Sequence, residues 1–153
     1  LKTANSFKVV ELVPAGDDLW DQRAAPAALE DNKAIVVEVT GSVDFASVYS
    51  FDEHMPEPTT ARNAAVVSRL RGREFHSLTV LGWLERYARE MREAGNLYLI
   101  SGVEQELLDV LEKTGLVEVI GPENIFLETE RLGESTQQAL AAARAWIEGS
   151  EPS

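Results

Sequence analysis

The sequence predicts an α/β fold in which a mixed, mainly parallel β-sheet is flanked by helices. Short β-branched runs at residues 34–40 and 64–70 have the length and composition of strands. Longer segments with apolar residues at helical spacing follow them, of which residues 77–94 are the clearest. Strands that alternate with helices favour parallel pairing through right-handed crossovers.

The strand candidates are defined by short apolar runs bounded by turn residues. Residues 56–60 contain two prolines and indicate an irregular connection. Residues 20–32 contain Pro26 and several small residues, and we interpret them as a loop. We expect the first strand to pair antiparallel at an edge of the sheet, and strand 64–70, apolar on both faces in its first half, to be central. The expected strands are residues 7–13, 34–40, 64–70 and 97–101.

The helix candidates are marked by their first and last residues. Gly95 follows the helix of residues 77–94 at a position where a left-handed cap is common. Ser101 and Ser135 each precede Glu or Gln by three residues, so a capping box and a helix are expected at both serines. A weaker short helix is expected at residues 44–54. Two further apolar runs, residues 116–120 and 125–127, flank a Gly-Pro turn.

Length and composition indicate one globular domain. The 153 residues can bury a full core, and no apolar run is long enough to cross a bilayer. We divide the chain into an N-terminal strand and loop (residues 1–33), a core (34–148) and a tail (149–153). The start at Leu1 and not at a methionine suggests a piece of a longer protein, and a cleaved tag would leave the same start.

Charge and cysteine content exclude several classes of function. The chain has no cysteine, which excludes disulfides, thiolate catalysis and Cys-based zinc sites. The net charge of −12 argues against nucleic acid and anionic membrane surfaces as partners. Residues 62–95 are the exception, with 7 basic and 4 acidic side chains, a local excess of +3.

The junction between the strand of residues 64–70 and the helix of residues 77–94 is the main candidate site. In open α/β sheets, functional groups gather where a strand ends and the next helix begins. Arg71 and Arg73 lie in this junction before Ser77. These side chains could bind an anion or a nucleotide, and Ser77 could be phosphorylated. The simpler interpretation, which we favour and which is compatible with both, is that Ser77 caps the helix.

An enzyme is not expected. His76 stands beside Ser77, but no G-x-S-x-G elbow and no glycine pattern for an oxyanion hole surround them. Neither dinucleotide-binding nor P-loop glycine motifs occur, and the carboxylates show no spacing that demands a metal. We therefore predict no catalytic residue, no metal and no cofactor.

Five segments, in the correct order, resemble the STAS domains of bacterial SulP-type anion transporters. The central one runs from the middle strand through the junction into the long helix, and together the five cover most of the chain. They are residues 66–87 (VVSRLRGREFHSLTVLGWLERY), 41–46 (GSVDFA), 98–103 (YLISGV), 114–126 (TGLVEVIGPENIF) and 133–147.

The resemblance implies a non-catalytic regulatory or interaction domain on the cytoplasmic face of the membrane. It implies the transmembrane domain of the same chain as a partner, a homodimeric full-length transporter and a possible cytosolic regulatory protein. Family substrates are anions such as sulfate, bicarbonate and dicarboxylates, and the transport pathway lies outside this domain.

The chain departs from the family's phosphorylation motif, Asp-Ser-(Ser/Thr)-Gly. His76 takes the aspartate position, Ser77 the phosphoserine position, and the glycine is missing; a shift of one residue aligns Thr79 with the threonine of many transporter versions. Ser77 and Thr79 are therefore the candidate regulatory residues. The alternatives are a stand-alone STAS regulator of the anti-sigma-factor-antagonist type and a nucleotide- or anion-binding sensor module.

Overall fold

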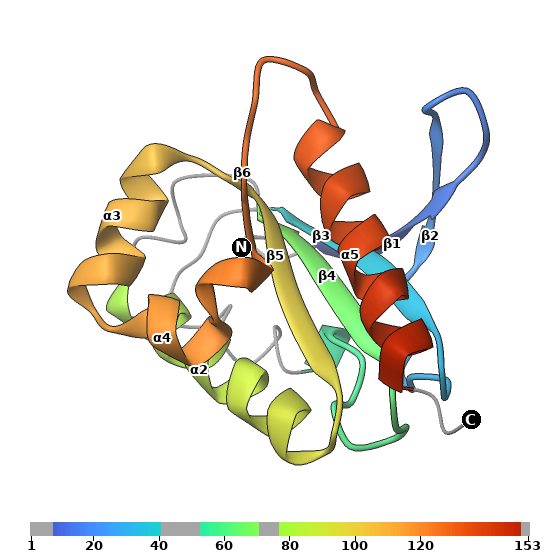
Figure 1. Cartoon of the computed structure of the whole chain (residues 1–153), viewed down its shortest axis with the longest axis horizontal. Helices are drawn as coiled ribbons and strands as arrows, with labels where there is room; N and C mark the ends of the chain where they lie inside the picture. Colours follow the sequence, from blue (N-terminus) through green and yellow to red (C-terminus); the bar gives the residue numbers. More distant parts are fainter. Residues whose placement is uncertain (1–7, 41–52, 71–76, 151–153) are drawn as a thin grey trace, which may run out of the picture.

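A six-stranded sheet with the order β2-β1-β3-β4-β5-β6 forms the centre of the computed structural model, which describes residues 8–40, 53–70 and 77–150 (Figure 1). Strands β3 to β6 are parallel, and β1 is antiparallel to both of its neighbours. The predicted α/β class with a mainly parallel sheet is confirmed. The strands are β1 (Lys8–Pro14), β2 (Trp20–Ala24), β3 (Ala34–Thr40), β4 (Ala65–Leu70), β5 (Leu97–Val103) and β6 (Ile125–Leu127).

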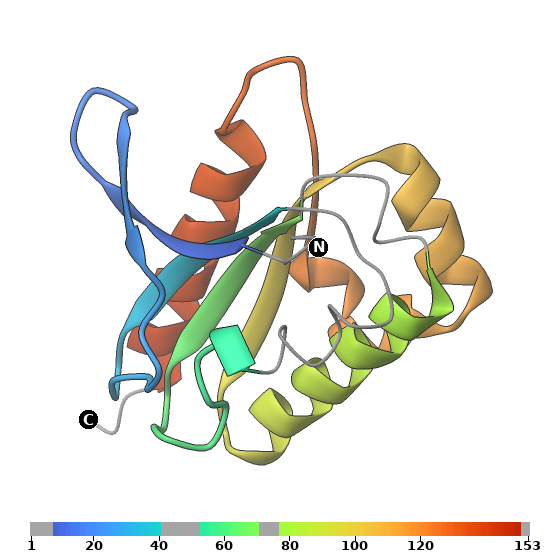
Figure 2. The same cartoon turned by 180° about the vertical axis from the view of Figure 1, so that it is seen from behind.

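Helices cover both faces of the sheet. Helix α5 packs on one face, and α2, α3 and α4 pack on the other, so α5 is in front in Figure 1 and α2 in Figure 2. No helix of the described ranges is long and apolar enough to cross a membrane. The helices are α2 (Leu78–Glu93), α3 (Gln105–Lys113), α4 (Leu116–Ile120), the 3-10 turn η2 (Pro122–Asn124) and α5 (Glu134–Ser150).

The alternation of side chains along the strands produces two cores. In β3, Val37 and Val39 face the α2–α4 side, and Val36 faces α5. All residues of β4 are buried, which confirms its central place. The three tryptophans pack in or beside these cores. Trp83 of α2 is buried in the core between that helix and the sheet, and Trp20 and Trp146 pack against the core on the α5 side.

The prediction for residues 20–32 is wrong in its first part. Residues Trp20–Ala24 form β2, which pairs antiparallel with β1 from Pro14↔Trp20 to Val10↔Ala24. Because four of the five residues of β2 are exposed, the strand lacks the alternation of apolar residues that marks a half-buried strand. The outer edge on this side is therefore β2, and the first strand is not at an edge as expected.

Both predicted capping boxes are also wrong. Strand β5 continues past Ser101 to Val103, and α3 begins only at Gln105, with Glu104 at its N-cap and no side-chain cap. Helix α5 begins at Glu134, so Ser135 lies inside its first turn. Both serines are fully buried and bond to other elements instead of their own helix ends.

The remaining elements agree with expectation where the structure describes them. Residues 55–60 form an irregular connection, and the two apolar runs become helix α4 and strand β6. Helix α2 ends before Gly95, whose φ of 80° is the left-handed conformation expected there. The short helix expected at residues 44–54 lies mostly outside the described residues.

Candidate functional site at the carboxyl edge of the sheet

The carboxyl ends of the parallel strands meet at one edge of the sheet, and α2 and α5 begin there. Ser77 is exposed and is the N-cap of α2, where its Oγ accepts a hydrogen bond from the backbone N–H of Val80 at 3.3 Å. The capping role predicted for Ser77 is therefore confirmed. Thr79, in the first turn, is also exposed.

The start of α2 is open to a negatively charged group. No acidic residue occupies the first turn of this helix, so the positive end of its dipole is not compensated by its own side chains. Exposed hydroxyls at this position could accept a phosphoryl group or lie beside a bound anion. Arg71, Arg73 and His76 lie outside the described residues, so their place relative to Ser77 stays a prediction.

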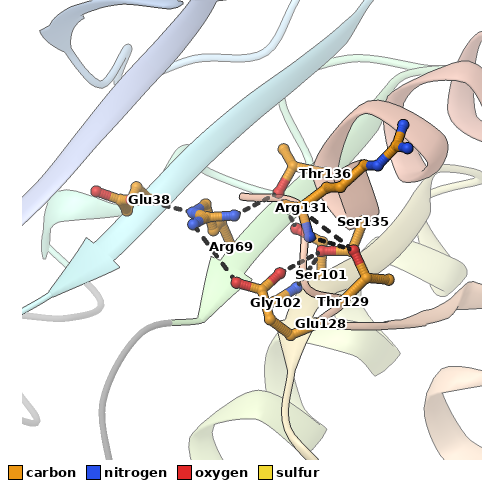
Figure 3. A network of polar contacts seen from close by, with 9 residues as sticks. All are labelled: Glu38, Arg69, Ser101, Gly102, Glu128, Thr129, Arg131, Ser135 and Thr136. Carbon is orange, nitrogen blue, oxygen red and sulfur yellow. Dashed lines mark hydrogen bonds and ion pairs between the residues drawn. The ribbon is translucent and has the colours of Figure 1, made fainter. Parts of the chain in front are cut away.

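A network of buried polar side chains, centred on Arg69, lies beneath the same edge (Figure 3). Arg69 is in β4 and is only 4% exposed. Its Nε donates to Glu38 Oε2 at 2.9 Å, and its Nη1 donates to Thr136 Oγ1 at 3.1 Å. Its Nη2 forms a longer ion pair with Glu128 Oε2 at 3.9 Å. Since a buried guanidinium requires compensation, these partners hold β3, β4, the segment after β6 and α5 together.

Two hydroxyls of the first turn of α5 extend the network to β5. Thr136 Oγ1 and Ser101 Oγ are 2.8 Å apart and share a hydrogen bond. Ser135 Oγ accepts from the backbone N–H of Gly102 at 3.0 Å and donates to Glu128 Oε1 at 3.1 Å. The start of α5 is therefore fixed by bonds to the sheet (Figure 3).

Gly102 lies at a close contact between β5 and β4. Its φ is +67°, and a methyl group on it would lie 3.3 Å from the carbonyl oxygen of Leu70. Glycine takes this left-handed conformation at the lowest cost, because it has no Cβ. The backbone N–H of Gly102 can therefore reach Ser135 while β4 and β5 stay close.

Sequence analysis missed the Arg69 network. The partners of Arg69 are 31 residues away at Glu38 and 67 residues away at Thr136, so no local motif connects them. One signal was present: Arg69 stands in a strand whose other residues suit complete burial, and buried arginines are almost always paired.

Two tyrosines of the α2–β5 region have buried phenol groups, and their pKa values are raised. Tyr87 Oη donates to the carbonyl of Pro56 at 2.7 Å, and burial raises the pKa of Tyr87 well above its usual range. Burial likewise raises the pKa of Tyr98, whose ring meets that of Tyr87 edge to face at 5.1 Å. These tyrosines are core residues. Within the described ranges, no cluster of His, Asp or Glu side chains has the form of a metal site.

The fold described above is that of a known domain family. A family model described as the STAS domain matches residues 25–132, which is more than half of the chain. The chain therefore belongs to the STAS domain family.

Two solved structures share the fold. A sulfate transporter family protein from Wolinella succinogenes is 18% identical, with a TM-score of 0.53, over 82% of this chain and 93% of that chain. The murine Solute Carrier 26 family member A9 anion transporter, in the inward-facing state, is 13% identical, with a TM-score of 0.60. This second match covers 90% of the present chain but only 22% of the transporter. A comparison with curated proteins found no match.

Proposed function

We propose that this chain is the cytoplasmic regulatory domain of a SulP-type anion transporter. The observation that carries the proposal is the match of 90% of the chain to 22% of an anion transporter, because it relates this STAS fold to one part of a much longer membrane protein. The second structural match, a sulfate transporter family protein, points to the same class. The domain acts by contact with the membrane part and with regulatory proteins, and catalyses no reaction.

The exposed start of α2 is the regulatory position that we propose within this function. Ser77 and Thr79 carry accessible hydroxyls at the positive end of a helix of 16 residues. Phosphorylation of either would add about −1.5 to −2 charges there. A bound anion or nucleotide phosphate would use the same dipole, with Arg71 and Arg73 as its expected counter-charges.

The first test is the gene that encodes this chain. Several hydrophobic segments of about 20 residues each upstream of Leu1 are expected. A start codon a few residues before Leu1 would overturn the transporter proposal. It would favour the alternative of a stand-alone STAS regulator, for which phosphorylation of Ser77 is the decisive assay.

The second test is transport by the full-length protein. Uptake of radiolabelled sulfate, bicarbonate and dicarboxylates is compared between the intact protein and a version in which this domain is replaced by a flexible linker. A regulatory domain predicts a changed rate with an unchanged order of preference among the anions, because the pathway lies in the membrane part. Equal rates at equal amounts of protein in the membrane would contradict a regulatory role.

A further inference from the structure

A groove of about 310 Å³ separates the β1–β2 hairpin from the first half of α5. We call it the hairpin groove; its lining includes Leu19, Trp20, Leu140 and Ala141. The hairpin is anchored beside the helix because Asp18 Oδ1 accepts from Gln137 Nε2 at 3.1 Å. The two walls therefore belong to elements more than 100 residues apart that pack side by side.

The tip of the hairpin has an unusual backbone conformation. Gly16, Asp17 and Asp18 have φ values of 87°, 49° and 62°, and Leu19 N–H donates to the Gly16 carbonyl at 2.9 Å. Consecutive non-glycine residues at positive φ are uncommon, although aspartate tolerates it better than most. This tight turn presents Leu19, which is 66% exposed.

One exposed leucine lines the groove, and a second lies in the segment that precedes α5. Leu19 and Leu132 are 66% and 78% exposed, and they are two of the four large exposed apolar side chains within the described ranges. A methyl group on Gly133 would lie 3.8 Å from Nε1 of Trp20, so the residue that follows Leu132 lies beside a residue of the groove. Leu19 and the apolar lining of the groove form the apolar area that a bound segment would cover.

The charge around the groove indicates which kind of molecule would bind there. Asp17 and Asp18 line the groove, and the adjoining segments add Asp21, Glu130 and Glu134 against Arg131. Glu11 and Glu128 are paired with Arg23 and Arg69 and do not count. Arg144 adds one positive charge at the groove itself. A second copy would bring the same negative surface against this one, and an anionic lipid surface would be repelled. A segment with an apolar anchor flanked by Lys or Arg is complementary.

We propose that the hairpin groove binds a Lys/Arg-bearing amphipathic segment from a cytoplasmic loop of the transporter's own membrane part. This choice of partner rests on the proposed function, because cytoplasmic loops of membrane proteins carry an excess of Lys and Arg. The apolar side of the segment covers Leu19 and Leu132, and its cations face Asp17 and Asp18. The groove is thus the surface through which the domain contacts the membrane part.

The chemistry of the groove is tested on the present chain with a helical peptide of about 18 Leu and Lys residues. Binding is measured by isothermal titration calorimetry. The first variant combines Leu19→Ala with Leu132→Ala, and the second combines Asp17→Asn with Asp18→Asn, since Asn also accepts positive φ. The control combines Leu78→Ala on α2 with Glu106→Gln on α3, which are exposed residues of other elements.

Each groove variant is expected to bind the peptide with an affinity about tenfold or more lower than that of the unaltered chain. The control variant is expected to lower the affinity by less than about twofold. Raising the salt from about 50 to 500 mM should weaken binding to the unaltered chain, since the charges are exposed. Equal affinities of the groove variants and the unaltered chain, or an equal loss in the control, would overturn the proposal. Binding of the chain to vesicles of anionic lipid would overturn it too.

The source of the segment is tested by zero-length carbodiimide cross-linking of the full-length protein in its membrane, read by mass spectrometry. We expect Asp17 or Asp18 joined to lysines of cytoplasmic loops in the membrane part. Absence of such links, or links only to a second copy of this domain or to a different protein, would overturn the assigned partner. If the gene encodes no membrane part, the proposed function and the source fail together, and the peptide titration still decides what the groove binds.

Discussion

Arg69 places a positive charge in the interior of the protein. A buried charge is stable there only when hydrogen-bonded and oppositely charged partners compensate for the loss of water. Two carboxylates and one hydroxyl surround it, and the carboxylate side chains of Glu38 and Glu128 are 21% exposed. Because the carboxylates keep some contact with water, loss of the arginine affects them less than loss of the carboxylates would affect the arginine. The fold therefore depends on Glu38 and Glu128 as much as on the arginine itself.

We expect Glu38→Ala to destabilise the chain by about 3–5 kcal/mol, because it leaves the Arg69 guanidinium without its shortest ion pair. Urea unfolding followed by circular dichroism measures the change. Glu85→Ala is the matched control, since Glu85 pairs with Arg89 on the exposed side of α2 and its loss is expected to cost at most about 1 kcal/mol. A similar small effect for both would mean that Arg69 finds water or another partner.

Ser77 gives a second prediction at this scale. Ser77→Ala removes the side-chain acceptor for the Val80 N–H and is expected to cost about 1 kcal/mol. Ser77→Asp keeps an acceptor and adds a negative charge at the start of α2, so it should be at least as stable as the unaltered chain. Thermal unfolding of both, with exposed Thr79→Ala as control, checks this order. A destabilised Asp variant would contradict an uncompensated helix start.

At the scale of the elements, the first turn of α5 and the end of β5 form one unit. The helix uses Ser135 and Thr136 to bond to the strand, and Gly102 supplies both the N–H and the space. A helix that is positioned by side-chain bonds to a strand keeps its register only while the strand keeps its backbone conformation.

Gly102→Ala should therefore destabilise the chain by about 1–3 kcal/mol, since it combines a left-handed φ with a tight contact to the Leu70 carbonyl. Gly82→Ala is the control. Gly82 lies in the exposed middle of α2 with open space around it, so alanine there should stabilise the chain by about 0.5–1 kcal/mol. Equal effects of the two substitutions on the urea midpoint would contradict this account.

The sequence predicted the elements whose pattern reflects their own burial. Strands β3 and β4 and helix α2 were predicted because their apolar periodicity is strong. Strand β2 was missed because it pairs along one edge and buries little. The capping boxes failed because Ser101 and Ser135 match a short motif but are used by distant partners. Of the candidate site, Ser77 was predicted as a cap, and the Arg69 network was not predicted.

For the whole molecule, the stacked aromatic side chains join the layers. Trp83 and Tyr87 of α2 stack with their ring centroids 5.6 Å apart, and Tyr87 meets Tyr98 of β5. Both phenols are buried and are held neutral by that burial, which raises their pKa values. Ionisation of either phenol therefore requires the helix and the sheet to separate.

This gives an expected dependence of stability on alkaline pH. In the unfolded chain the phenols ionise near a pKa of about 10, but in the folded chain they stay neutral well above it. Their contribution is complete below about pH 10 and decreases above it, by about 1.4 kcal/mol per pH unit for each tyrosine. Urea unfolding between about pH 9 and 11 measures the slope. Tyr98→Phe should remove about half of the slope, and an unchanged slope would contradict the burial argument.

The Arg69 network also determines when the domain can finish folding during synthesis. Arg69 leaves the ribosome long before Glu128 and Thr136, because 67 residues separate it from Thr136. At roughly 5–20 residues per second, the nascent chain carries an incompletely paired arginine in its central strand for several seconds. A nascent chain that stops before α5 has Glu38 and Glu128 but lacks Thr136, so Nη1 of Arg69 is without its hydroxyl partner. Completion of the last helix therefore completes the pairing of Arg69.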